Sequence, residues 1–304
     1  MKNPIVHIAA ATAMMFWGIT YVWSKIVFET YTPLTTVTIR LFLSSIILIG
    51  FLLIINQYEK IDKKHYKLLI VSSIFNPFLY FIGEYYGLSL VSATVSAVII
   101  STIPIFTPFA AKRFFKEKLS ILNSAGLIIS FSGVLMLILK DDYSLNASGL
   151  GIGLLFLAVF SAVIYSVMVK KLTNHYSPLT IIANQNFIGA IMFIPLFFYY
   201  DFEAFVNITP NMITILSLIM LAIFGSSVCY VLYAYAIKHL ELTKANIYTN
   251  LIPIFAAITS YFFLGEEFYA IKIIGMITVI VGIVLSQLKF KTFLKPKIKP
   301  PVIN

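Results

Sequence analysis

Two ionisable side chains, Arg40 and Glu84, stand inside long apolar stretches of this chain. An ionisable group in such a place costs free energy, so it is first considered as part of a functional site. Side by side, each would lower the cost of burying the other, whereas Glu84 alone would be favoured in its protonated form. A glutamate that gains and loses a proton can carry it, and Arg40 can hold that carboxylate or an anionic group of a substrate. Two structural alternatives stay open: a buried ion pair, and an Arg40 head group that reaches the surface.

Uncharged polar and aromatic side chains recur at helical spacing in the same apolar stretches and form a candidate lining for a binding cavity. Asn76 and Tyr80 share one helical face with Glu84. The other members of this candidate lining are Trp17, Tyr21, Ser101, Asn184, Gln185, Tyr230, Tyr233, Asn246 and Asn250. Polar stripes of this kind face the interior of a helix bundle or a wet cavity. The alternative is that they join helices to one another, each contributing less than about 1 kcal/mol.

The composition places these residues in a membrane. Of the 304 residues, 60% are hydrophobic and 11% are charged, which is far from the balance of a soluble domain. A net charge of +10 would suit nucleic acid, but Lys and Arg between long apolar runs are better explained by membrane orientation. With Cys229 as the single cysteine, an internal disulfide is excluded and metal binding by thiolates is not indicated.

A membrane span needs roughly 20 mainly apolar residues, and by this rule the chain contains ten candidate spans. We predict spans at residues 5–27, 33–56, 67–88, 91–111, 120–139, 148–170, 178–200, 211–237, 244–264 and 268–288. Lys and Arg gather in every second connection and in the tail at 289–304, which predicts that both termini are cytoplasmic.

The sequence Ile103-Pro104-Ile105-Phe106 recurs as Ile252-Pro253-Ile254-Phe255. We therefore predict two five-helix repeats, at residues 1–140 and 141–288, followed by a basic cytoplasmic tail. Because five is odd, the second repeat would enter the membrane from the opposite side, which is a common device of transporters. Pro104 and Pro253 would then act as matched hinges or gates, although a static bend for packing stays open.

The order and doubling of several motifs resemble the EamA branch of the drug/metabolite transporter superfamily. The resemblance rests on the ten spans in two halves, Trp17-Gly18 with Lys25, Pro33 with Arg40, the Pro-x-Phe run of span four, and the Lys-Glu-Lys and Gly-Glu-Glu segments that open spans five and ten. It covers nearly the whole chain. It implies a carrier, commonly an exporter of amino acids or other small metabolites, with a central cavity lined by helices of both halves.

Enzyme chemistry is not indicated. No serine has an evident histidine partner, and the sequence contains neither a Walker motif nor a glycine loop for phosphate, so no catalytic residue, cofactor or metal is predicted. We predict a secondary transporter of the cytoplasmic membrane that exports a small metabolite by alternating access, with protons as a candidate coupling ion. A drug or nucleotide-sugar carrier and an integral-membrane enzyme for lipid-linked substrates are the alternatives. The predicted partners are the substrate and the lipid bilayer, without nucleic acid, and the chain would be a monomer or a homodimer.

Overall fold

The computed structural model describes residues 4–117, 120–136, 148–265 and 270–287, and this part of the chain is helical apart from short connections. Within it, eight helices are long and apolar enough to cross a membrane. They are α1 (Pro4–Phe28), α2 (Pro33–Ile54), α3–α4 (Lys63–Leu90), α5–α6 (Ala93–Phe115), α8 (Gly149–Leu172), α9 (Pro178–Tyr200), α11–α12 (Met212–His239) and α13–α14 (Leu242–Leu264). Two shorter apolar helices are α7 (Ile121–Met136) and α15 (Ala270–Gln287), and α10 (Phe202–Asn207) is a short helix after α9.

These helices confirm the predicted all-α membrane class. Eight of the ten predicted spans coincide with helices of membrane-crossing length, and the spans predicted at 120–139 and 268–288 coincide with the two shorter helices. The arrangement as ten spans in two inverted repeats stays a prediction. The predicted basic tail at 289–304 lies outside the described residues.

The starts of α2 and α9 are fixed by the same local chemistry. The Thr32 hydroxyl accepts a hydrogen bond from the backbone N–H of Thr35 at 3.1 Å, and the Ser177 hydroxyl accepts one from Thr180 at 3.2 Å. In each helix a proline follows the capping residue, at a position where the missing N–H would be unsatisfied anyway. Both helices therefore begin where the sequence predicts.

Two of the long helices contain a π-helical segment. One, η1 (Ile74–Leu79), joins α3 (Lys63–Ser73) to α4 (Tyr80–Leu90), and the chain kinks there because Asn76 has extended backbone angles (φ −150°, ψ 119°). The other, η2 (Leu221–Val228), joins α11 (Met212–Met220) to α12 (Cys229–His239). Such segments widen a helix locally and free backbone groups for other partners.

The repeated Ile-Pro-Ile-Phe motifs begin new helix halves. A turn after α5 (Ala93–Ile100) leads into α6 (Ile103–Phe115), and a 3₁₀ segment, η3 (Ile247–Leu251), links α13 (Leu242–Asn246) to α14 (Ile252–Leu264). Pro104 and Pro253 occupy the first turn of α6 and α14. We expected each proline to bend a continuous helix, but the structure breaks both helices just before the proline, where its missing N–H costs little.

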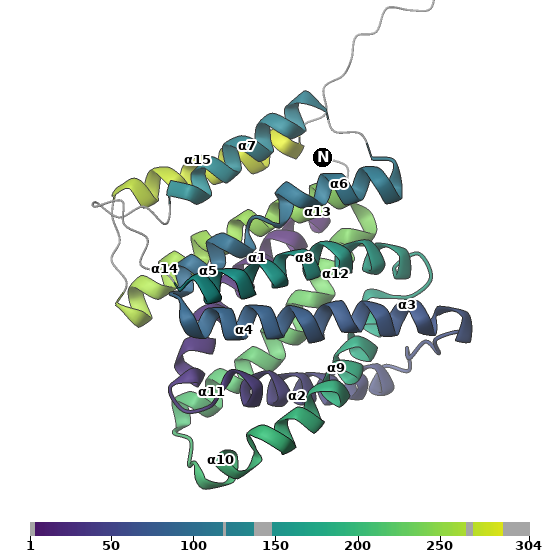
Figure 1. Ribbon diagram of the computed structural model, residues 1–304. Helices are drawn as coiled ribbons and strands as arrows, with labels where there is room; N and C mark the ends of the chain where they lie inside the picture. Colours follow the sequence, from purple (N-terminus) through teal and green to yellow (C-terminus); the bar gives the residue numbers. More distant parts are fainter. Residues whose placement is uncertain (1–3, 118–119, 137–147, 266–269, 288–304) are drawn as a thin grey trace, which may run out of the picture.

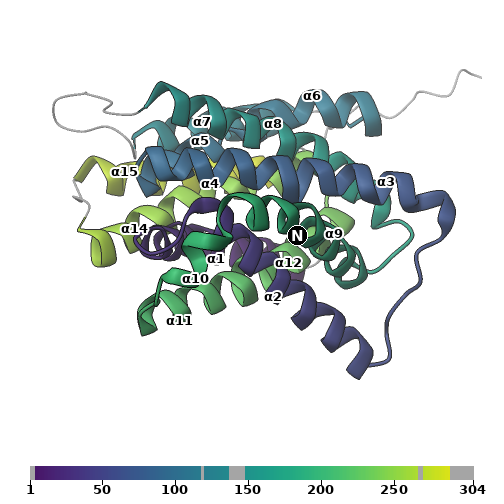
Figure 2. The ribbon, with the colours of Figure 1, turned by 60° about the horizontal axis from the view of Figure 1, so that its bottom comes forward.

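The helices pack in recurring pairs (Figure 1). α7 lies against α15 along one edge of the molecule, and α2 lies against α9 at the opposite edge. Between these pairs, α4 and α6 pack on α8, while α12 and α14 pack on α1. Figure 2 gives a second view of these helices and shows how α3 and α4 together make one long span.

Glycines allow the unusually close contact between α7 and α15. A Cβ atom at Gly126 would lie 2.5 Å from the backbone nitrogen of Ser286, and one at Gly133 would lie 2.6 Å from the carbonyl oxygen of Gly275. A side chain at either position would push the helices apart. These glycines therefore let two helices of the same chain pack closely.

Candidate functional site

Arg40 lies on α2 and is buried, with 2% of its surface exposed. Its Nε donates a hydrogen bond to Ser226 Oγ at 2.7 Å, and its Nη1 donates one to the hydroxyl of Tyr85. The guanidinium carbon lies over the rings of Phe81 and Tyr85, 4.6 Å and 5.2 Å from their centroids. The cation is therefore held by neutral hydroxyl groups and aromatic faces, which favour a flat, delocalised guanidinium over an ammonium group.

The π-helical segment η2 makes room for this cation. A Cβ atom at Gly225 would lie 2.7 Å from Nη2 of Arg40 and 2.9 Å from Cγ2 of Thr20, so no larger residue fits without displacing one of them. The carbonyl of Gly225 accepts a hydrogen bond from Nε1 of Trp17 at 3.1 Å. Gly225 thus brings α1, α2 and η2 together at one point.

Glu84 lies on α4 and is also buried, with 8% of its surface exposed. Its Oε1 accepts hydrogen bonds from the hydroxyls of Tyr80 at 2.7 Å and Tyr21 at 2.9 Å. Hydrogen bonds from neutral donors partly replace the water that a buried carboxylate loses. The carboxyl group is thereby fixed between α1 and α4.

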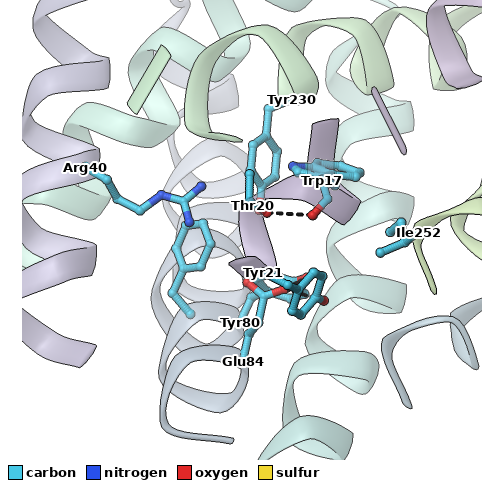
Figure 3. A pocket seen from close by; sticks show the side chains of 9 residues that line it. Trp17, Thr20, Tyr21, Arg40, Tyr80, Glu84, Tyr230 and Ile252 are labelled. Carbon is cyan, nitrogen blue, oxygen red and sulfur yellow. Dashed lines mark hydrogen bonds between the residues drawn. The ribbon is translucent and has the colours of Figure 1, made fainter. Parts of the chain in front are cut away.

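Arg40 and Glu84 line one small cavity of about 10 Å³, which has room for about one water molecule. Figure 3 shows α1 residues Trp17, Thr20 and Tyr21 between Arg40 on one side and Ile252 on the other. The two charges do not form a direct ion pair. In the described part of the chain, carboxylate contacts within 4.0 Å of a basic nitrogen are Lys64 with Asp62 and Lys244 with Glu241.

A second cavity, of about 30 Å³, shares walls with the first. Four residues line both cavities: Trp17, Tyr80, Tyr230 and Ile252. Trp17 packs edge-on against Tyr230 and Tyr233, with ring centroids 4.9 Å and 5.2 Å apart. The remaining wall of the second cavity is formed by Asn76, Ile100, Ile103, Ala162, Tyr165, Tyr233 and Thr249.

The structure brings together most of the residues that the sequence analysis selected. Those that line one or both cavities are Arg40, Glu84, Trp17, Tyr21, Asn76, Tyr80, Tyr230 and Tyr233. Asn246 and Gln185 stand directly behind this wall, where Asn246 accepts from the Tyr233 hydroxyl and Gln185 accepts from Tyr165 at 3.1 Å. These two amides orient cavity tyrosines.

Three selected residues lie elsewhere. Asn184 is half-buried, and its amide donates to the carbonyl of Thr180 on its own helix. The Ser101 hydroxyl donates to the carbonyl of Val98, also nearby in the chain. Asn250 donates to Ser130 of α7 at 2.7 Å, so it joins η3 to the neighbouring short helix.

The sequence analysis did not identify the residues that hold the hydrogen-bond partner of Arg40 in place. Nδ2 of Asn186 donates to Ser44 Oγ and to the carbonyl of Ser226, each at 2.7 Å, and the Ser44 and Ser227 hydroxyls are also 2.7 Å apart. These residues hold Ser226, the hydrogen-bond partner of Arg40. Ser44 could have been found, because it stands one helical turn after Arg40 on the same face of α2.

Several membrane-crossing helices, some of them broken, surround a small cavity that is lined by two side chains of opposite charge. This combination defines the chain as a multi-pass membrane protein of the transporter class. The sequence profile of the EamA-like transporter family matches residues 4–139 and again residues 149–288, and the chain belongs to this family. The resemblance seen in the sequence is confirmed.

Relatives of the chain are named as transporters without a stated substrate. It is 25% identical to an uncharacterized transporter of Archaeoglobus fulgidus, over 94% of this chain and 99% of that protein. It is also 25% identical to the uncharacterized transporter YetK of Bacillus subtilis, over 94% and 87% of the two chains. A crystal structure with 13% identity matches with a TM-score of 0.74 over 94% of this chain and 97% of the other, a likeness that shows the fold alone.

Proposed function

We propose that this protein is a secondary transporter that exports amino acids or related small metabolites across the cytoplasmic membrane by alternating access. The observation that carries the proposal is the pair of buried opposite charges, Arg40 and Glu84, on one small central cavity. An α-amino acid carries a carboxylate and an ammonium group on the same carbon, and these charges are complementary to Arg40 and Glu84. Its carboxylate would bind Arg40, and its ammonium group would bind Glu84.

Glu84 is also the candidate proton carrier. The structure has Glu84 at a cavity with room for little more than a water molecule, so a substrate must widen the site when it binds. A proton on Glu84 would neutralise it when the substrate has left, and release of that proton would restore the carboxylate for the next substrate. Substrate and proton would then compete for one group, which is a simple basis for exchange.

Alternating access requires two halves that exchange roles, and the helix packing supports the two inverted five-helix repeats. If the repeats are exchanged, the contact of α4 with α8 becomes that of α12 with α1, and the contact of α6 with α8 becomes that of α14 with α1. The pairs α2–α9 and α7–α15 stay the same under this exchange, because the two helices of each pair only trade places. Such a set of contacts is expected of two similar halves related by a two-fold axis.

Contacts at the end of α6 support a gate on the side that we predict to be cytoplasmic. The Glu117 carboxylate accepts hydrogen bonds from the backbone of Leu242 at 2.6 Å and of Thr243 at 3.2 Å, at the start of α13. Nζ of Lys170 donates to the carbonyls of Ile237 and Leu240 at the end of α12. Both charges therefore hold the connection between α12 and α13, and release of these contacts would open the cavity on this side.

The test is uptake into proteoliposomes containing the full chain, over a panel of amino acids, nucleosides and amphipathic cations, with and without a pH gradient. We expect zwitterionic amino acids to be transported and the pH gradient to accelerate uptake. Glu84→Gln should abolish the effect of the gradient, while Glu59→Gln, which changes an exposed carboxylate, should retain it. Unchanged gradient dependence in Glu84→Gln would refute the role of Glu84, and absence of amino-acid transport would refute the substrate class.

A further inference from the structure

The two central cavities differ in what their walls offer to a ligand. The first exposes two charged groups, Arg40 and Glu84, together with the Thr20 side chain. The second adjoins it across Trp17, Tyr80, Tyr230 and Ile252. A single ligand that lies across this shared wall would meet charges at one end and the second cavity at the other.

The polar groups around the second cavity are already engaged with one another. The hydroxyl of Tyr165 donates to Gln185 at 3.1 Å, and the hydroxyl of Tyr233 donates to Asn246. The amide of Asn76 donates to the hydroxyl of Tyr230 at 3.2 Å. What remains for a ligand is mainly apolar, because these bonds already occupy the amide of Asn76 and the hydroxyl donors of Tyr165 and Tyr233.

Aliphatic side chains complete this wall. Ile100 and Ile103 flank the turn between α5 and α6, and both are buried, with 1% and 4% of their surfaces exposed. Ala162 of α8 also lines the cavity and is 9% exposed. Ala162 is the smallest side chain of this wall, so a larger residue there would extend into the cavity and remove space from a ligand.

We propose that the second cavity is the subsite for an apolar side chain of the substrate, and that Ala162 sets the largest side chain that the transporter accepts. The proposal rests on the proposed function, since it assigns the charged end of a zwitterion to Arg40 and Glu84. It adds that transported zwitterions carry an uncharged aliphatic or aromatic group. Ala162 is here a specificity-determining residue that leaves recognition of the charged end unchanged.

The experiment measures uptake of glycine, alanine, leucine and phenylalanine into proteoliposomes containing the full chain. In the wild type, apparent affinity should rise about fourfold for each buried methylene, until the side chain exceeds the space that the subsite can open. Ala162→Leu should weaken leucine and phenylalanine uptake at least tenfold, and glycine uptake less than twofold. Ile103→Ala, which enlarges the same subsite, should shift the preference toward phenylalanine.

Gly153→Leu is the matched control, because Gly153 lies on the same helix and a side chain there meets open space. It should leave the order of the four substrates unchanged. If Ala162→Leu weakens all four equally, or keeps the wild-type order, the subsite assignment is wrong while the proposed function stands. If the wild type transports none of the four, the proposed amino-acid substrate class and this inference are both wrong. Should Ala162→Leu fail to fold, Ile103→Ala decides, and an unchanged order of substrates in that variant overturns the inference.

Discussion

At the scale of single residues, the unusual feature is a buried cation without a direct carboxylate partner. Arg40 is surrounded by Ser226, Tyr85 and the ring of Phe81, while Glu84 is held separately by two tyrosines. A direct ion pair would have satisfied each charge with the other. Because the two charges are held apart by neutral groups, each can still bind an opposite charge on a ligand.

Gly225 is predicted to be essential for the position of Arg40. In Gly225→Ala, the new methyl group would contact Nη2 of Arg40 and Cγ2 of Thr20, so the guanidinium must leave Ser226 or Tyr85. We expect a loss of about 1–3 kcal/mol in stability and a large loss of transport. Unfolding in detergent and proteoliposome uptake measure the two effects.

Gly50→Ala is the control for this prediction. No atom lies within 4 Å of a Cβ placed at Gly50, and alanine favours a helix by roughly 0.5–1 kcal/mol over glycine. Stability should therefore be unchanged or higher, with normal transport. Equal transport by Gly225→Ala and Gly50→Ala would show that the space at Gly225 is not needed.

The sequence identified the charged residues of the site more readily than their partners. Arg40 and Glu84 stand out because charges are rare in apolar spans, whereas the uncharged hydroxyls of Ser226 and Tyr85, which bind Arg40, carry no such signal. The choice between Asn184 and its near neighbour Asn186 depends on the rotation of α9, which periodicity does not fix to within one residue. The packing of α9 in the folded protein decides that Asn186, and not Asn184, bonds Ser226.

The two asparagines of α9 allow a direct comparison. Asn186→Leu would leave the carbonyl of Ser226 without its side-chain donor, and we expect a loss of about 1–3 kcal/mol in stability. Asn184→Leu removes a bond to its own helix at a half-buried position and should cost less than about 0.5 kcal/mol. Unfolding of both variants in the same detergent is the measurement, and equal losses would contradict the supporting role of Asn186.

At the scale of helices, the positions of the eight long helices were predictable and their internal breaks were not. Apolar runs of about 20 residues mark where the long helices lie. Capping residues such as Thr32 and Ser177 mark where they begin. The π-helical segments and the turn before Ile103 lie inside continuous apolar runs, where hydrophobicity gives no sign of a break. Proline was a correct sign of irregular backbone, but it marks the start of a new helix half.

From the broken helices we predict opposite effects of alanine at Pro104 and Pro253 on access to the cavity. Alanine supplies a backbone N–H that can bond to a carbonyl one turn earlier, across the break, so each break should become more helical and its half less able to move. Under the proposed inverted repeat, Pro104→Ala should lower access to the cavity from the cytoplasmic side, and Pro253→Ala from the outside. A change of about 1 kcal/mol corresponds to roughly a fivefold change in the ratio of labelling from the two sides.

Thiol labelling measures this ratio. The reporter is Thr20→Cys at the cavity, in a Cys229→Ala background, because Cys229 is the chain's own cysteine and is buried. Oriented vesicles then expose one side at a time to a membrane-impermeant reagent. If both proline variants change labelling equally from the two sides, the prolines are static features of packing.

At the scale of the whole molecule, α2 and α9 hold each other through acidic caps at opposite ends of the pair. Asp201, directly after α9, accepts from the backbone N–H of Thr35 at 3.1 Å and from its hydroxyl at 2.8 Å, at the start of α2. Glu59, after α2, accepts from the backbone N–H of Ser177 at 2.7 Å, at the start of α9. Each helix start thus receives a carboxylate from the chain that follows the other helix.

The two caps should nevertheless contribute unequally to stability. Asp201 is 9% exposed and also accepts from the Thr32 hydroxyl, whereas Glu59 is exposed and makes its bond in contact with water. We therefore expect Asp201→Ala to cost about 2 kcal/mol and Glu59→Ala less than about 0.5 kcal/mol, measured by unfolding in detergent. The double variant should lose about the sum, since the sites lie at opposite ends of the helix pair. Equal losses in the single variants would mean that burial does not set the strength of these caps, and a double loss well beyond the sum would mean that the two ends are coupled through α2 and α9.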